Sequence, residues 1–166
     1  IHANLYAACF GLMPPEGSTA YEKLLLTPGR VCGPLPMYFA LRSLGRLGKY
    51  DILYRLLTRR DEYGWRNMLR EGATACFEAW GKSQKWNTSL CHPWASGAIP
   101  IIIEELAGLR PDPDAPGGFH FEPHLPGKLD DFALQVPLRS QLLTVRQEIW
   151  RAALVVQPRN ENRKEE

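Results

Sequence analysis

The sequence has no long apolar run and no marked excess of charge of either sign. None of its apolar stretches approaches the roughly 20 residues that a membrane-spanning helix needs. Its 20 basic and 18 acidic residues give a net charge of +2, which offers no argument for binding to nucleic acid or to a membrane surface. What remains is an ordinary globular composition, 45% hydrophobic over 166 residues, enough for one or two small domains.

Cysteine is scarce, with four residues and no C-x-x-C pair. No histidine stands at zinc-ligand spacing from them, so the sequence predicts no metal site. We interpret Cys9, Cys32, Cys76 and Cys91 as free, mostly buried thiols, which favours a reducing compartment such as the cytoplasm. The compartment itself stays open, because no signal peptide is visible and the sequence begins at Ile1 rather than at methionine.

Before Gly108 the apolar residues mostly follow the helical period. The predicted helices span residues 1–13, 18–26, 37–47, 52–59, 61–69 and 98–108. Each has one wide apolar face and the connections are short, which is typical of an array or toroid of α/α hairpins. A helix that begins at Ile1 with no capping sequence before it predicts that the chain is cut from a longer protein.

The composition changes after Gly108. Residues 110–118 are rich in proline, aspartate and glycine and predict a linker. The apolar residues of 119–158 alternate with period two, which predicts three to five short antiparallel strands in a small β-sandwich-like domain. We therefore predict a mainly α protein, with a helical domain over 1–109, this β-domain, and a disordered polar tail over 159–166.

Residues 72–97, GATACFEAWGKSQKWNTSLCHPWASG, concentrate large aromatic rings in a segment with the composition of a loop. The aromatic and ionisable residues of interest are Phe77, Glu78, Trp80, Trp86, His92 and Trp94. Aromatic faces with a few convergent polar groups suit a sugar, whose C–H face stacks on a ring while its hydroxyls take hydrogen bonds. Composition alone leaves a sugar site and a buried aromatic cluster equally open, and Trp86 fits a core as well as a pocket.

Two motifs in this segment resemble the last active-site segments of bacterial α-L-rhamnosidases, glycoside hydrolase family 78. They are residues 72–80 (GATACFEAW) and 89–96 (SLCHPWAS). Where the family commonly has G-A-T-T-x-W-E-x-W, this sequence has Ala75 and Phe77, and neither change removes a polar catalytic group. Residues 113–119 and 122–127 also match the proline-glycine segments that lead into the family's C-terminal β-domain, so the resemblance extends from residue 1 to about residue 158.

The resemblance implies part of an (α/α)₆ toroid of helical hairpins, of which this chain would supply roughly the last half. It also implies hydrolysis of terminal α-L-rhamnose with inversion, for which two carboxyl groups about 6.5–9.5 Å apart are needed. Glu78 is expected to be the general base, and rings at Phe77 and Trp80 to desolvate it and raise its pKa. The general acid would lie upstream, so this chain alone is expected to be inactive without the missing N-terminal part of the same enzyme.

For the substrate, the resemblance implies a rhamnose-containing glycoside or oligosaccharide and no cofactor. His92 is expected to contact a sugar hydroxyl, and Trp80 and Trp94 to form the apolar wall that receives the C6 methyl group. Phe77 is also expected among the substrate-binding residues. The pair Glu104-Glu105 lies in the last turn of a predicted helix, and we expect it on the outer surface.

Other interpretations of these residues remain. Glu78 can instead form a salt bridge to a neighbouring helix, and His92 can hold the loop to a backbone carbonyl. The protein as a whole can be another sugar-active (α/α)₆ enzyme, such as an unsaturated uronyl hydrolase or a trehalase-like enzyme. A non-catalytic carbohydrate-binding fragment is the third hypothesis, and the sequence upstream of Ile1 would separate the three.

Overall fold

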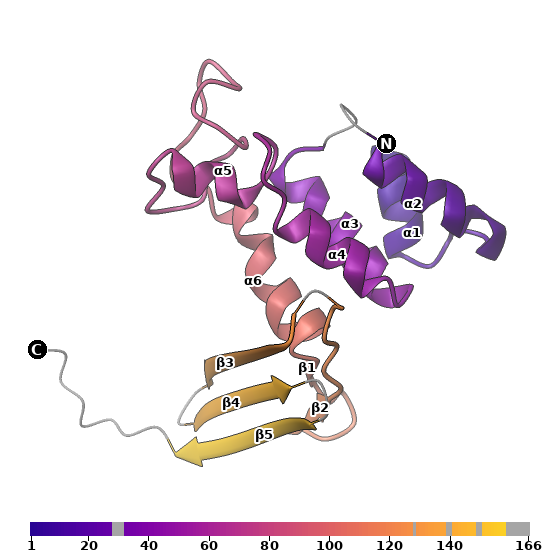
Figure 1. Ribbon diagram of the computed structural model, residues 1–166, viewed down its shortest axis with the longest axis vertical. Helices are drawn as coiled ribbons and strands as arrows, with labels where there is room; N and C mark the ends of the chain where they lie inside the picture. The colour runs from indigo at the N-terminus through magenta and orange to yellow at the C-terminus, as the bar shows by residue number, and fades with distance from the viewer. Residues whose placement is uncertain (28–31, 128, 139–140, 149–150, 159–166) are drawn as a thin grey trace, which may run out of the picture. The chain divides into compact units, whose positions relative to one another are not determined.

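The computed structural model describes residues 1–27, 32–127, 129–138, 141–148 and 151–158 (Figure 1). Two compact units are present, Ile1–Ile101 and Ile102–Glu166, and each is described by itself. The predicted tail over 159–166 lies outside the described residues. Among those described, no helix is both long enough and apolar enough to cross a membrane.

All regular elements in the described residues of the first unit are helices (Figure 1). Its elements are α1 (His2–Cys9), η1 (Pro15–Gly17), α2 (Ser18–Leu26), α3 (Pro34–Arg46), α4 (Tyr50–Leu57), α5 (Trp65–Arg70), η2 (Pro93–Gly97) and α6 (Ala98–Ile101). All six predicted helices therefore exist, although several bounds were wrong. The third begins at Pro34 rather than at residue 37, because proline needs no hydrogen bond to its nitrogen in a first helical turn.

The fifth predicted helix, over residues 61–69, is too long at its start. Asp61 accepts a hydrogen bond from the backbone N–H of Tyr63 at 3.0 Å and pairs with the Arg59 guanidinium. A short acidic side chain that bonds the backbone two residues on offers an alternative to the helical ladder. The helix consequently starts only at Trp65, after the extended Gly64.

The core of the first unit lies where its helices meet. Leu5 of α1, Leu41 and Leu44 of α3, Leu53 of α4 and Met68 of α5 are all fully buried. They come from elements that the sequence separates widely, so each of these helices buries part of an apolar face. Met68 belongs to α5, and α5 leads directly into the segment with the two motifs.

The second unit begins with one π-helical turn, η3 (Ile102–Leu106), closed by a 2.8 Å hydrogen bond from Ala107 N–H to Ile102 O. The prediction of one regular helix over 98–108 was therefore wrong in its second half. Gly108 then turns the chain with φ +65°, where a Cβ atom would lie only 1.8 Å from the carbonyl oxygen of Glu122. Only glycine allows both this dihedral angle and this close approach.

In the described residues that follow there are five strands, and all of their pairings are antiparallel. The first sheet pairs β1 (Leu109–Pro111) with β2 (Phe119–Phe121), and the second orders β3 (Asp131–Leu138), β4 (Gln141–Glu148) and β5 (Arg151–Pro158) side by side. The predicted strands are confirmed, but the predicted linker over 110–118 was wrong at its start. Arg110 and Pro111 belong to β1, because Arg110 pairs with His120 and the rest of that segment is the hairpin loop.

The core of the second unit contains Ala107, Leu109, Leu143 and Val145, with Phe132 among the apolar residues packed against it. The three-stranded sheet contributes alternate residues to this core, which is the pattern that the period-two sequence predicted.

Glu105 is buried, so its predicted place on the outer surface was wrong. Its side chain is 1% exposed, and one carboxylate oxygen accepts a 2.6 Å hydrogen bond from the Arg110 guanidinium. The π-helical turn changes the direction in which this side chain points relative to a regular helix, so helical periodicity could not place it. Glu105 is a buried structural carboxylate of the second unit.

The four cysteines are free, as predicted. Only Cys9 and Cys32 are buried, whereas Cys76 is half-buried and Cys91 is exposed, so the description of the thiols as mostly buried was wrong for the second pair. Both exceptions lie on the irregular segment between α5 and η2, where helix packing does not cover side chains.

Candidate functional site

The predicted loop over residues 72–97 is confirmed between α5 and η2, where no helix or strand occurs, but its last five residues form the 3-10 helix η2. It starts at Gly72, whose φ of 78° ends α5 and redirects the chain. Two backbone hydrogen bonds then join its ends, from His92 N–H to Cys76 O at 2.7 Å and from Glu78 N–H to Ser89 O at 2.8 Å. The two sequence motifs, separated along the chain, therefore lie side by side.

Glu78 is held at both carboxylate oxygens. Oε1 accepts from the Lys85 ammonium at 2.5 Å, and Oε2 accepts from the backbone N–H of Ser89 at 3.2 Å. The side chain is 17% exposed, so it lies near the surface of the loop rather than in the core. The alternative of a salt bridge is thus realised in part, but with a lysine of the same loop and not with a neighbouring helix.

These contacts set the charge state of the carboxyl group. The Lys85 hydrogen bond, followed by the Ser89 N–H, holds the pKa of Glu78 below its ordinary value of 4.5, and the nearby His92 ring acts in the same direction. Burial raises this pKa by less than these contacts lower it. The prediction that aromatic neighbours raise the pKa was therefore wrong, because a cation and an amide face the carboxylate. Glu78 is ionised at neutral pH.

The two aromatic residues that flank Glu78 in the motif are buried. Phe77 is 2% exposed and Trp80 is 3% exposed. The indole N–H of Trp80 donates to Cys32 O at 2.7 Å, and its own carbonyl oxygen accepts from the Asn67 amide at 3.0 Å. Trp80 thus fastens the loop to the helical core, and neither ring presents a face to solvent in this structure.

His92 and Trp94, unlike Phe77 and Trp80, are accessible to solvent. Trp94 is 46% exposed, and the His92 ring lies against it with centroids 4.1 Å apart and planes inclined by 39°. His92 stands directly before η2, and its backbone N–H donates to Cys76 O, two residues before Glu78. The predicted site residues that a ligand can reach are therefore Glu78, His92 and Trp94.

The sequence analysis did not single out Lys85, and it left open whether Trp86 lies in a core or a pocket. Trp86 is 96% exposed, so the core alternative was wrong. It occupies a turn closed by two hydrogen bonds from Thr88, whose N–H and hydroxyl both donate to Lys85 O at 3.1 and 2.7 Å. No sequence signal pairs Lys85 with Glu78, because loop folding and not helical spacing brings these two residues together.

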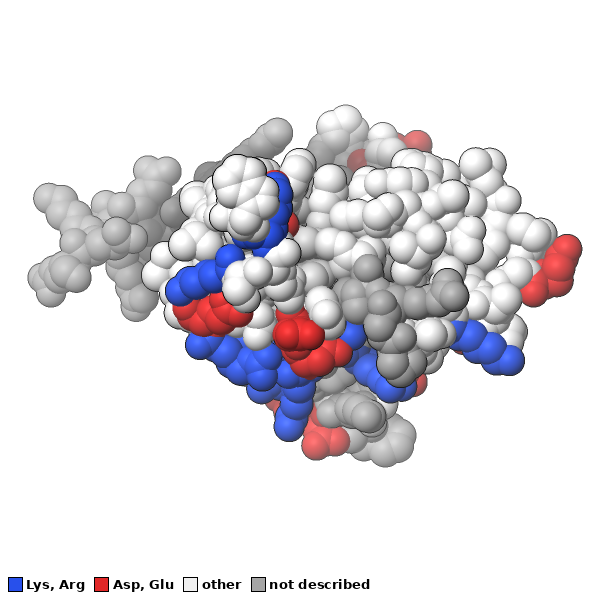
Figure 2. All heavy atoms as spheres, turned by 90° about the horizontal axis from the view of Figure 1, so that it is seen from above, with Lys and Arg blue, Asp and Glu red and all other residues white. Residues whose placement is uncertain are grey.

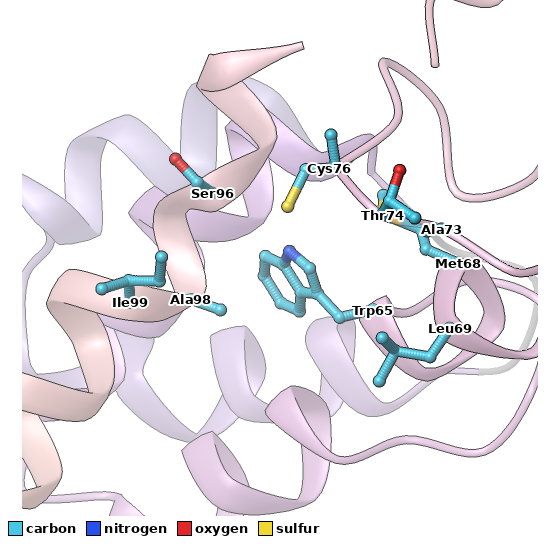
Figure 3. A pocket seen from close by; sticks show the side chains of 10 residues that line it. Trp65, Met68, Leu69, Ala73, Thr74, Cys76, Ser96, Ala98 and Ile99 are labelled. Atoms are coloured by element: carbon cyan, nitrogen blue, oxygen red, sulfur yellow. The ribbon is translucent and has the colours of Figure 1, made fainter. Parts of the chain in front are cut away.

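The first motif also lines an apolar cavity of about 270 Å³ in the first unit (Figure 3). The indole of Trp65 points into it, between the residues around Thr74 and Cys76 and those at the start of α6 (Figure 3). Its other lining residues include Met68, Leu69, Ser96 and Ile99. Burial raises the pKa of the Cys76 thiol, so this thiol is protonated at neutral pH. The cavity has no carboxylate in its lining and holds no acid-base pair.

The surface charges do not indicate another kind of site. Figure 2 shows basic and acidic side chains next to one another on the face it presents, with no broad area of one sign. Among the residues that the structure describes, no group of three or more histidine, cysteine, aspartate or glutamate side chains is placed to hold a metal ion. The loop and the start of η2 thus offer an ionised carboxylate, Glu78, together with the imidazole of His92 and the accessible indole of Trp94.

Such a carboxylate, next to an aromatic ring on a loop of a helical unit, suits an enzyme that hydrolyses sugars. The comparisons with known proteins agree. The family model of the bacterial alpha-L-rhamnosidase 6 hairpin glycosidase domain matches residues 2–104, more than half of the chain. The chain therefore belongs to this glycosidase family, which confirms the resemblance of its two motifs. A search of curated proteins and a search of solved structures gave no match.

Proposed function

We propose that the chain is part of an enzyme that removes terminal α-L-rhamnose from glycosides with inversion, and that Glu78 is its general base. The observation that carries the proposal is the state of Glu78: this carboxylate of the family-matched segment is held ionised at both oxygens, beside His92. An ionised carboxylate can accept a proton from water, which is what an inverting base must do.

In the proposed reaction, a water oxygen attacks the anomeric carbon while one water proton passes to Glu78. The bond from the anomeric carbon to the glycosidic oxygen breaks, and that oxygen takes a proton from a second carboxyl group, the general acid. We place the general acid on polypeptide outside these 166 residues, which also completes an (α/α)₆ toroid. Glu105 is unsuited to the role because it is buried against Arg110 in the second unit.

The solvent exposure of the site residues decides which of them are proposed to contact the sugar. His92 is proposed to contact a rhamnose hydroxyl, and the exposed face of Trp94 to pack on the apolar side of the sugar that carries the C6 methyl group. Phe77 and Trp80, which the resemblance also places in the substrate site, are proposed to support the loop from behind because they are buried.

The test uses the complete enzyme that contains this chain. It is assayed with p-nitrophenyl α-L-rhamnoside, and the first anomer released is identified by proton NMR. We expect rhamnose, released as the β-anomer. Trehalose and an unsaturated uronide are assayed in parallel, because faster hydrolysis of either would replace rhamnose as the substrate. Release of the α-anomer would contradict inversion, and no hydrolysis of any of the three would contradict the enzyme assignment.

A further inference from the structure

The loop after Glu78 is fixed to the rest of the first unit at several points. The backbone N–H of Lys82 donates to the Glu71 carboxylate at 2.7 Å, and the Gln84 amide donates to Glu62 O at 2.8 Å. The turn from Lys85 to Thr88 is closed by its own hydrogen bonds. Lys85 therefore reaches Glu78 from a backbone whose position is determined, rather than from a free loop.

The contact between Lys85 and Glu78 is directed at one oxygen only. A carboxylate has about four lone-pair sites on two oxygens. The Lys85 ammonium uses one on Oε1 and the Ser89 N–H uses one on Oε2, so an acceptor site remains on each oxygen. The orientation of the carboxylate is thereby fixed while it can still accept a hydrogen bond from water.

We propose that Lys85 is a positioning residue for Glu78, which orients the carboxylate and keeps it ionised so that it can activate water. This inference rests on the proposed function, since Lys85 acts only through Glu78. A surface ion pair with a 42% exposed lysine contributes little to folding. The effect of Lys85 is consequently expected in the chemistry of the site and not in the stability of the protein.

The first test is a titration of the complete enzyme with ¹³C-labelled glutamate, in which the Glu78→Gln variant assigns the signal. The groups that face Glu78 are the Lys85 ammonium, the Ser89 N–H and the His92 ring. Lys85→Met should raise the pKa of Glu78, and Lys85→Arg should restore the lower value. Lys82→Met is the matched control, because Lys82 lies on the same loop but donates to Glu71 O instead.

The second test is the pH profile of kcat/KM with p-nitrophenyl α-L-rhamnoside. Lys85→Met should move the acid limb to higher pH and lower kcat roughly tenfold to 100-fold, since misplacing a catalytic group has effects of this order. Lys85→Arg should recover most of the rate, and Lys82→Met should leave the acid limb in place. A Lys85→Met variant with unchanged or raised kcat would overturn the inference, as it would mean that Lys85 is dispensable or blocks the base.

The two proposals fail in different ways. An unshifted Glu78 titration in an active enzyme overturns the role of Lys85 and leaves the proposed function standing. A shifted titration in an enzyme that hydrolyses none of the glycosides overturns the proposed function, and the role of Lys85 with it.

Discussion

The indole of Trp80 meets the indole of Trp65 edge to face, with ring centroids 4.8 Å apart and planes inclined by 84°. Trp65 is the first residue of α5, and its indole N–H donates to Ala95 O at 2.7 Å. One pair of rings therefore ties the first motif to α5 and, through Ala95, to the second motif. We infer that the loop between α5 and η2 depends on this aromatic pair for its position.

We expect Trp80→Ala to destabilise the first unit by about 3–5 kcal/mol, the usual cost of truncating a buried tryptophan. The variant loses the contact with Trp65 and the hydrogen bond to Cys32 O together. Urea denaturation measures the free energy of unfolding. Trp86→Ala is the matched control and should change it by no more than about 0.5 kcal/mol, because the ring is exposed. Equal losses in the two variants would contradict the roles assigned to these rings.

Trp94→Ala should weaken rhamnose binding by about 1 kcal/mol, the scale of one aromatic contact beyond area burial. The ring is half-exposed and follows a proline in η2, so its removal leaves the helical core intact. Calorimetry with rhamnose on the complete enzyme gives the affinity, and thermal unfolding of the same variant gives the stability. Normal binding combined with a large loss of stability would mean that Trp94 is a packing residue.

The pair Glu105–Arg110 supplies a prediction for the second unit. Arg110→Ala leaves a buried carboxylate without its guanidinium and should destabilise this unit by about 1–3 kcal/mol, a value reduced by the partial exposure of Arg110. Glu105→Gln should cost less, since its amide can still be hydrogen-bonded. A double-mutant cycle from chemical denaturation measures the coupling, and additive effects would show that the two side chains do not stabilise each other.

Periodicity predicted the helices and strands well because each element packs one apolar face. α2 has the predicted bounds, and the strands pair in the antiparallel register expected of alternating residues. Prediction from periodicity failed where a local hydrogen bond or an irregular turn interrupts the regular spacing of apolar residues. Asp61 delays the start of α5, and the π-helical turn at the start of the second unit points Glu105 into the protein.

The candidate site could be predicted only in part. The motifs identified Glu78, His92 and Trp94, which are the residues of the predicted site that are not buried. Trp80 is buried and Trp94 is exposed. Composition could not predict this difference, because both are tryptophans of the same segment. The contact between Lys85 and Glu78 depends on hydrogen bonds within an irregular loop, for which no sequence period exists.

The charge environment of Glu78 predicts the pH dependence of hydrolysis. A lowered pKa means that the base is ionised at all pH values above it and loses activity as the pH falls through it. The acid limb of kcat/KM should therefore lie below the ordinary carboxyl value of 4.5. The profile should be measured from about pH 3 to about pH 8, a range that includes the ordinary pKa values of carboxyl groups. An acid limb near pH 6, about that of a desolvated carboxyl, would contradict the ion pair with Lys85.

The most direct test of the account is the turnover of Glu78→Gln in the complete enzyme. Glutamine has nearly the same shape and keeps a hydrogen-bond acceptor, but it cannot take a proton from water. With p-nitrophenyl α-L-rhamnoside we expect kcat to fall by about 10²–10⁴ while the fold and the affinity for rhamnose are retained. Glu16→Gln, an exposed substitution outside the loop, serves as the control. Turnover of Glu78→Gln within about tenfold of the parent would contradict the assignment of Glu78 as the general base.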